Sequence, residues 1–254
     1  MIRFELRPKL NYFQRVGESV RKSKMSISKG EPNQDVSEAL AIGDHKAPTK
    51  TSRNPKRTYA AILEAATDEF AAHGFGGARI DAIAARAKTN KRMLYHYFGD
   101  KEALYLAVLE AAYASIRTAE KSLDLTHREP EAGMRELALF TWHYFLGHPE
   151  FLSLLATENM LQAQYLKRSA RIAQMHSHLI AEMADVLRRG GEAGLFRPKV
   201  DPVSVYLTIA ALGYFYLSNR HTLSTIFGRK LEAPDAIEAW GEHIVSVTLA
   251  SIKA

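Results

Sequence analysis

The chain has 254 residues and 46% of them are hydrophobic, which is enough for a small domain and a larger one with buried cores. Its 34 Lys and Arg residues exceed its 28 Asp and Glu residues, and a formal net charge of +6 suits a polyanionic partner. The absence of cysteine excludes disulfides and thiolate metal sites. No apolar run approaches the roughly 20 residues that span a bilayer, and the N-terminus lacks the apolar segment of a secretory signal, so we expect a cytoplasmic protein.

Residues 1–52 are predicted to form a disordered, basic extension, because they are polar and show no sustained apolar periodicity. The sequence leaves two questions open: whether residues 10–20 form a short helix, and whether translation begins at Met25. Five cations lead into the next segment, at Lys46, Lys50, Arg53, Lys56 and Arg57. They act either as a basic arm toward a polyanion or as a solubilising tail.

Two helices are predicted next. The first covers residues 55–73 and ends at Gly74, with apolar residues at helical spacing at Tyr59, Ile62, Leu63, Ala66 and Phe70. The second covers residues 79–87, with one narrow apolar stripe at Ile80, Ile83, Ala84 and Ala87. A stripe on so short a helix needs a partner, so the two helices are expected to pack together.

A third short helix is predicted over residues 91–98. Asn90 is the expected N-cap, because its side chain can accept a hydrogen bond from a free backbone N–H group at the helix start. Gly99 is expected to end the helix in the left-handed region. Leu94 and Phe98 form the inner face, which leaves cations and aromatic side chains on the outer surface.

The segment over residues 79–104 is typical of a helix-turn-helix that binds DNA. The second helix of such a pair lies in the major groove, and its N-terminal residues contact base edges. Lys91 and Arg92 occupy that turn, while Lys101 at a helix start combines its charge with free N–H groups. The expected DNA-binding residues are Arg79, Lys88, Thr89, Asn90, Lys91, Arg92, Tyr95, His96, Tyr97 and Lys101. An ordinary helical hairpin with a solvated basic face is the alternative.

The segment over residues 55–104 resembles the TetR family of bacterial repressors. The shared motif reads Ile83-Ala84, Leu94-Tyr95-His96-Tyr97-Phe98 and Lys101-Glu102-Ala103-Leu104. The family usually has Gly, an aliphatic residue and Ser at the turn, where this chain has Lys88, Thr89 and Asn90, so the phosphate contacts and the operator sequence stay open. The resemblance implies an all-α protein, in which a three-helix DNA-binding domain precedes a larger helical domain for effector binding and dimerisation. It also implies repression rather than activation.

A longer helix is predicted to begin after Asp100, its expected N-cap, and to run to Ile116. It would connect the DNA-binding domain, placed at residues 53–112, with the second domain at residues 113–254. About 17 residues at 1.5 Å each would span about 25 Å, which is enough for a lever between the two domains.

The second domain is predicted to contain a series of helices, from its apolar periodicity. They cover residues 131–146, 151–166 as one helix or two short ones, 169–189 closed by Gly190 and Gly191, 203–218 after the cap Asp201 and Pro202, and 234–252. The fourth is apolar nearly all round and must be buried nearly all round. We therefore expect residues 202–218 and 234–252 to form a homodimer face, with burial inside one domain as the alternative. The resemblance favours the dimer, because these repressors generally pair through their last two helices.

Polar and aromatic residues among apolar ones in the second domain are typical of a small-molecule cavity. The expected ligand-binding residues are Trp142, His143, Glu158, Asn159, Met175, His176, Tyr214 and Asn219, with Tyr206 and Arg220 in the same mixture. Each of them could instead be an ordinary core or surface residue. The segments over residues 148–168 and 200–228 resemble a subgroup related to the pyrimidine-utilisation and nicotinate-degradation repressors. That resemblance implies a small-molecule inducer, such as a planar heteroaromatic compound or an aromatic acid.

We expect no metal, no cofactor and no enzymatic activity. His176 and His178 are two positions apart on a helix and cannot share an ion, and the chain lacks an activated nucleophile and a Gly-rich phosphate loop. The residues and the resemblance together favour a ligand-responsive transcriptional repressor on a pseudo-palindromic DNA operator. An architectural DNA-binding dimer without an effector, and a helical ligand carrier or enzyme with an incidental helix-turn-helix, are the alternatives.

Overall fold

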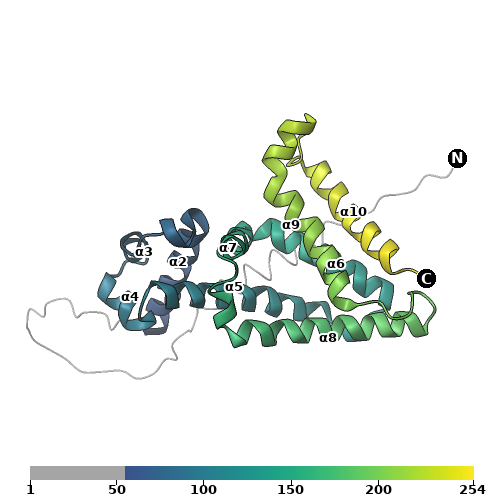
Figure 1. Ribbon diagram of the computed structural model, residues 1–254, viewed down its shortest axis with the longest axis horizontal. Helices are drawn as coiled ribbons and strands as arrows, with labels where there is room; N and C mark the ends of the chain where they lie inside the picture. The colour runs from purple at the N-terminus through teal and green to yellow at the C-terminus, as the bar shows by residue number, and fades with distance from the viewer. Residues whose placement is uncertain (1–54) are drawn as a thin grey trace, which may run out of the picture. The chain divides into compact units, whose positions relative to one another are not determined.

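The computed structural model describes residues 55–254. The predictions for residues 1–52, including a short helix over residues 10–20 and translation from Met25, lie outside the described residues. The described part is helical apart from one isolated bridge between Phe196 and Lys253, which confirms the all-α prediction there (Figure 1). Its α-helices and 3-10 turns (η) are α2 (Pro55–Gly77), α3 (Ile80–Arg86), α4 (Lys91–Phe98), α5 (Lys101–Glu120), η1 (Lys121–Leu123), η2 (Leu125–His127), α6 (Pro130–Gly147), α7 (Pro149–Met160), η3 (Leu166–Arg168), α8 (Ala170–Glu192), α9 (Pro202–Phe227) and α10 (Pro234–Ile252).

Helices α2, α3 and α4 form a small cluster at one end of this part of the chain (Figure 1). Ile62 and Phe70 of α2, Ile83 of α3 and Leu94 of α4 are buried at its centre. These are residues of the apolar faces that helical spacing predicts. Helix α5 packs on α2 and leaves the cluster for the larger part, where α8 packs along it. It runs without a break across the predicted domain boundary at residue 112.

The small cluster meets the larger part where α2 packs against α7. Helix α2 breaks at Gly74, whose φ of 63° favours glycine, and a Cβ at this position would contact Thr157 of α7. Beyond the break, the ring centroid of Phe75 lies 5.2 Å from that of Tyr105 in α5 and 4.6 Å from that of Tyr165. An aromatic cluster therefore joins the end of α2 to α5 and to the segment that follows α7.

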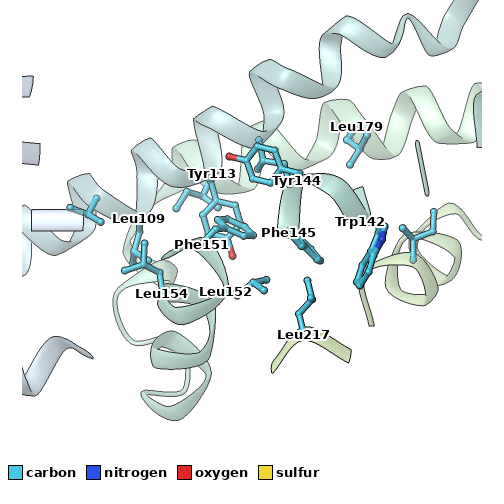
Figure 2. Packing of buried hydrophobic residues seen from close by; sticks show 14 of the residues in the cluster. Leu109, Tyr113, Trp142, Tyr144, Phe145, Phe151, Leu152, Leu154, Leu179 and Leu217 are labelled. Atoms are coloured by element: carbon cyan, nitrogen blue, oxygen red, sulfur yellow. The ribbon is translucent and has the colours of Figure 1, made fainter. Parts of the chain in front are cut away.

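Helix α6 lies at the centre of the larger part and packs on α8, α9 and α10. Its Trp142 is 1% exposed, and the indole N–H group donates a hydrogen bond to the carbonyl oxygen of Ile237 in α10 at 3.2 Å. Figure 2 shows Trp142 together with a second group of rings that includes Tyr113 and Phe151, whose centroids are 5.3 Å apart. The core is thus aromatic and continuous from α5 to α10.

Several predicted boundaries change in the structure. Helix α5 continues past Ile116 to Glu120, and α9 continues past residue 218 to Phe227. The segment over residues 151–166 is not one helix, because α7 ends at Met160 and the short η3 follows. Apolar periodicity weakens near these ends, where burial of individual residues depends on neighbouring helices.

The prediction that Gly190 and Gly191 close the helix before them is wrong. Helix α8 continues through both glycines to Glu192. A Cβ at Gly190 would lie 2.0 Å from Cδ2 of Phe196, which is buried, whereas no atom lies within 4 Å of a Cβ at Gly191. Gly190 therefore makes room for the ring of Phe196 inside a regular helix.

We predict that Gly190→Ala lowers the free energy of unfolding by about 2–3 kcal/mol, because the added methyl group overpacks against Phe196. Gly191→Ala is the matched control. Alanine has open space there and favours the helix, so it should be neutral or raise stability by about 0.5–1 kcal/mol. Urea unfolding of both variants measures the difference, and equal stabilities would contradict this role of Gly190.

Candidate DNA-binding and effector-binding sites

Helix α4 is held at both ends by the caps that the sequence predicts. Oδ1 of Asn90 accepts a hydrogen bond from the backbone N–H group of Met93 at 3.0 Å, and Gly99 ends the helix with a φ of 83°. Oδ1 of Asp100 then accepts from the N–H group of Ala103 at 2.7 Å, which begins α5. The caps fix the length and direction of α4 between α3 and α5.

The predicted DNA-binding residues divide into two groups by exposure. Arg79, Lys88, Asn90, Lys91, Arg92, Tyr95 and His96 are exposed, whereas Thr89, Tyr97 and Lys101 are half-buried. The first turn of α4 contains no acidic residue, so two cations add to the positive end of the helix dipole. This arrangement favours an anion at the start of α4.

The two cations in the first turn of α4, Lys91 and Arg92, have different neighbours. Nζ of Lys91 lies 2.7 Å from Oδ1 of Asp81 in α3, and both side chains are more than half exposed. An exposed ion pair of this kind contributes little to stability, so Lys91 can exchange its partner for a phosphate or a base at small cost. Arg92 and Tyr95 are three positions apart and therefore neighbours on the surface of α4, and Tyr95 is 48% exposed.

Tyr97 and Lys101 pack against α2. The ring of Tyr97 meets that of Tyr59 edge to face, with centroids 6.2 Å apart. The ammonium group of Lys101 lies 4.9 Å from the ring centroid of Phe75, and burial lowers the pKa of Lys101, although the charge of Glu69 opposes this shift. Both side chains thus help to seat α4 and α5 on α2, and a direct contact of either with DNA stays a prediction.

The predicted ligand-binding residues do not form one cluster. Trp142 is part of the core and is bonded to the backbone of α10. Asn159 and Asn219 each donate a hydrogen bond to the carbonyl oxygen four positions earlier in the same helix. Glu158 is buried and accepts a hydrogen bond from the N–H group of Leu166 at 2.9 Å. His143 and Tyr214 are half-buried, and burial lowers the pKa of His143.

Met175 of α8 lies at a cavity, and His176 follows it in the chain. Met175 lines a cavity of about 430 Å³ whose lining comes from α5, the start of η1, and α8. The ring of His176 meets the rings of Tyr113 and Tyr206 edge to face, at centroid distances of 5.3 and 6.1 Å. These contacts connect α8 with α5 and α9.

The charged pair of Arg117 and Glu120 lies at this same place. The two residues are 7% and 5% exposed, and Nη1 of Arg117 lies 2.9 Å from Oε2 of Glu120. The guanidinium carbon lies 5.8 Å from the ring centroid of Tyr206. Burial raises the pKa of Glu120 to about 7, with Arg117 opposing the shift and Glu182 adding to it. A buried pair of charges is costly to desolvate, so it is weak evidence for stability and a candidate for function.

Sequence reasoning missed Arg117 and Glu120 because it ended the helix at Ile116. The spacing of the residues in the sequence could have revealed this pair. Arg117 and Glu120 continue, at intervals of four and three, an apolar stripe formed by Tyr105, Leu109 and Tyr113. Charged residues in register with a buried stripe are rare unless they are paired, and they mark the place where a core becomes polar.

The fold and these two regions define the class of protein: a helix-turn-helix DNA-binding protein with a second, helical part that contains a cavity of about 430 Å³. Across residues 55–254, no group of three His, Asp or Glu side chains is arranged to hold a metal ion. No helix in that range is long and apolar enough to cross a membrane.

Comparisons with known proteins agree with this class. The family model described as bacterial regulatory proteins of the tetR family matches residues 62–108, and the model described as the tetracyclin repressor-like C-terminal domain matches residues 130–248. The HTH-type transcriptional repressor NicS of Pseudomonas putida is 40% identical over 197 residues, which are 78% of this chain and 93% of NicS. The HTH-type transcriptional regulator RutR of Escherichia coli is 46% identical over 70 residues, 28% of this chain and 33% of RutR.

Solved structures show the same fold. The putative transcriptional regulator SCO4942 from Streptomyces coelicolor is 26% identical and superposes with a TM-score of 0.58, over 77% of this chain and 98% of that one. The chain therefore belongs to the tetR family of bacterial regulatory proteins, which confirms the resemblance found in the sequence. It is a DNA-binding transcriptional repressor, and its relatives are regulators of transcription.

We predict that Glu120→Gln makes stability less dependent on pH. The pKa of Glu120 rises from its ordinary value of 4.5 to about 7 in the folded protein. Between these values the folded state holds a proton that the unfolded state has lost, so the stability of the unsubstituted protein falls as the pH rises. Glutamine cannot ionise, so the variant should gain on the order of 2 kcal/mol relative to the unsubstituted protein between about pH 5 and pH 8.

Urea unfolding of both proteins at the two pH values measures this gain. A difference in stability that stays constant with pH would show that the carboxyl group of Glu120 titrates normally.

Proposed function

We propose that the protein acts in the cytoplasm as a homodimer that places two copies of α4 in successive major grooves of a pseudo-palindromic operator, about 34–36 Å apart. The observation that carries this proposal is α4 itself. It is capped at both ends and exposes Arg92 and Tyr95 on one surface, next to a first turn free of acidic residues. Arg92 and Lys91 would contact base edges, while the tyrosines and Lys101 contact phosphates.

The dimer is proposed to form through α9 and α10. Val203, Leu207 and Phe215 are 45%, 58% and 58% exposed, and their spacing of four and eight residues places them on one stripe of α9. Helix α10 exposes the small side chains of Ala239, Ser246 and Ala250. An apolar stripe that a domain leaves uncovered is typical of an interface, and a twofold axis would pair the stripe with its own copy. The hairpin of α9 and α10 lies at the opposite end from α4 in Figure 1.

Release from DNA is proposed to follow from a small-molecule inducer, a planar heteroaromatic compound or an aromatic acid, that binds in the larger domain. Met175 is a predicted ligand-binding residue that lines the cavity, and the predicted residue next to it, His176, contacts Tyr113 of α5. An inducer between α5 and α8 would favour a different position of α5 and so a different separation of the two α4 helices. A hundredfold loss of operator affinity needs about 2.7 kcal/mol of coupling, which is within the usual range for allostery.

Binding of the purified protein to its own upstream intergenic DNA tests this function, with salt varied and with aromatic acids and pyrimidines added. Specific binding that one compound releases is the expected result. Specific binding that no compound releases would favour an architectural DNA-binding dimer. If genome-wide selection of bound fragments also found no preferred sequence, the repressor proposal would be wrong, and a ligand carrier with an incidental helix-turn-helix would be favoured.

Two substitutions should separate base contacts from phosphate contacts. Arg92→Ala should relax sequence preference by about 1–3 kcal/mol, because it removes a side chain proposed to read a base edge. Lys101→Ala should weaken binding to all sequences alike and reduce the salt slope by about one unit. Binding of operator and scrambled DNA at several salt concentrations measures both effects. Lys199→Ala removes one exposed charge outside α4 and should change neither.

The proposed dimer face can be tested with one charge. Leu207→Glu should convert the protein to a monomer, because a buried, unpaired carboxylate would face its own copy across the twofold axis. Met160→Glu is the matched control, since Met160 is 85% exposed at the end of α7, outside the proposed interface. Sedimentation of both variants gives their masses. A Leu207→Glu dimer as stable as the unsubstituted one would place the interface elsewhere.

A further inference from the structure

We propose that Arg117 anchors a carboxylate group of the effector, and that this carboxylate takes the place of Glu120 as the partner of the guanidinium group. The inference rests on the proposed function, since it names the chemical class of the inducer and the residue that selects it. It specifies an acid with an apolar, planar body, whereas the fold and the family do not specify the compound.

Arg117 is a buried cation whose hydrogen bonds are incomplete. It is 7% exposed, yet Nε and Nη1 have no hydrogen-bond acceptor in the structure. Nη1 lies 2.9 Å from Oε2 of Glu120, but this contact is not aligned as a hydrogen bond, and Oε2 is itself without a donor. A guanidinium group presents its N–H donors as a fork that matches the two oxygens of a carboxylate. Glu120 meets this fork poorly, because its contact with Nη1 is not aligned and Nε has no acceptor.

Arg117 lines the cavity between α5 and α8. Arg117 and Glu120 are both among its lining residues. The volume of about 430 Å³ is within the range of small-molecule sites. Lys121 and Arg171 also line it and carry positive charges, of which that of Arg171 lies 3.7 Å from Glu110, while Glu182 adds a negative charge to the lining. Lys121 would attract an anion.

The walls of this region suit a planar, apolar body. Ala114, Met175 and Leu179 supply apolar surface to the cavity. The ring of Tyr206 lies over the guanidinium group of Arg117, and the ring of His176 lies beside those of Tyr113 and Tyr206. A ligand ring placed against Ala114, Met175 and Leu179 would gain apolar contact, while its carboxylate supplies the charge.

Glu120 is suited to give up its place. It is buried and lies near the like charge of Glu182 in α8, so its own carboxylate is held at a cost. When an external carboxylate pairs with Arg117, Glu120 can take a proton from water and become neutral. The exchange leaves the number of buried negative charges unchanged. The ion pair of Arg117 then joins α5 to the ligand instead of joining two residues of α5. The ligand thereby contacts the helix that leads to the DNA-binding cluster.

The test uses the full-length protein and two pairs of probes that differ only in charge: benzoate against benzamide, and pyridine-3-carboxylate against pyridine-3-carboxamide. Titration calorimetry should show that at least one acid binds more tightly than its amide by about 30-fold or more, as expected for a charge-assisted, two-pronged contact. Arg117→Gln should remove this preference, with amide binding unchanged. Arg188→Gln is the matched control, because Arg188 is an exposed arginine of α8 in surface ion pairs and should keep the preference.

Two more variants guard against a loss of binding through misfolding. Glu120→Gln removes the internal competitor and should raise the affinity for the acid by about threefold to tenfold, a gain that an unfolded protein cannot show. Arg117→Gln combined with Glu120→Gln removes both charges and should bind acid and amide alike. Circular dichroism and operator binding check that each variant is folded.

The inference is wrong if neither acid binds better than its amide, or if Arg117→Gln keeps the preference for the acid. Release of operator DNA by a neutral pyrimidine alone would also overturn it, while leaving the repressor intact. Acid binding that depends on Arg117 but does not affect the operator complex would support the site and contradict the proposed role of the inducer. The two proposals can therefore fail separately.

Discussion

The rest of the structure depends on the continuity of α5. Its 20 residues form one uninterrupted ladder of backbone hydrogen bonds from the Asp100 cap to Glu120. Its first turns pack on α2 and its later turns pack on α8, so both parts of the protein share a single rigid element. A helix of this length cannot bend sharply without losing hydrogen bonds. Any change in how its C-terminal turns pack must therefore reach the DNA-binding cluster, or be absorbed where α2 meets α7.

The contact between α2 and α7 decides how much of such a change is transmitted. The rings of Phe75, Tyr105 and Tyr165 pack closely there, and such aromatic packing resists small displacements. Burial raises the pKa of Tyr105 well above its ordinary value, and the neighbouring carboxylate of Glu158 adds to this shift, so the junction contains a buried phenol beside a buried carboxylate. A junction that buries polar groups is less stable than a fully apolar one, so a second packing arrangement lies closer in free energy. An element that switches between two states needs two packing arrangements that are close in free energy.

Features that depend on a few neighbouring residues could be predicted from the sequence. The caps Asn90 and Gly99 fix α4 at its predicted bounds, because a cap is satisfied within one helical turn. Features that depend on distant residues could not. Helix α8 passes through Gly190 because the ring of Phe196 needs the space, and nothing local reports that contact. The residues expected in a ligand site range from the buried Trp142 and Glu158 to the exposed Asn159, because composition shows which side chains are polar but not which helices bring them together.

The burial of Arg117 and Glu120 links the stability of the protein to the binding of a ligand. A pair of charges that lacks complete hydrogen bonds lowers stability relative to apolar residues of similar volume. The same incompleteness lets a ligand that completes the hydrogen bonds gain more free energy than it could from an arginine that is already satisfied. A binding site of this kind is destabilising when it is empty and stabilising when it is filled. Because the pair is part of α5, the difference in free energy is created on the one helix whose position both domains share, which is the condition for coupling a small molecule to DNA.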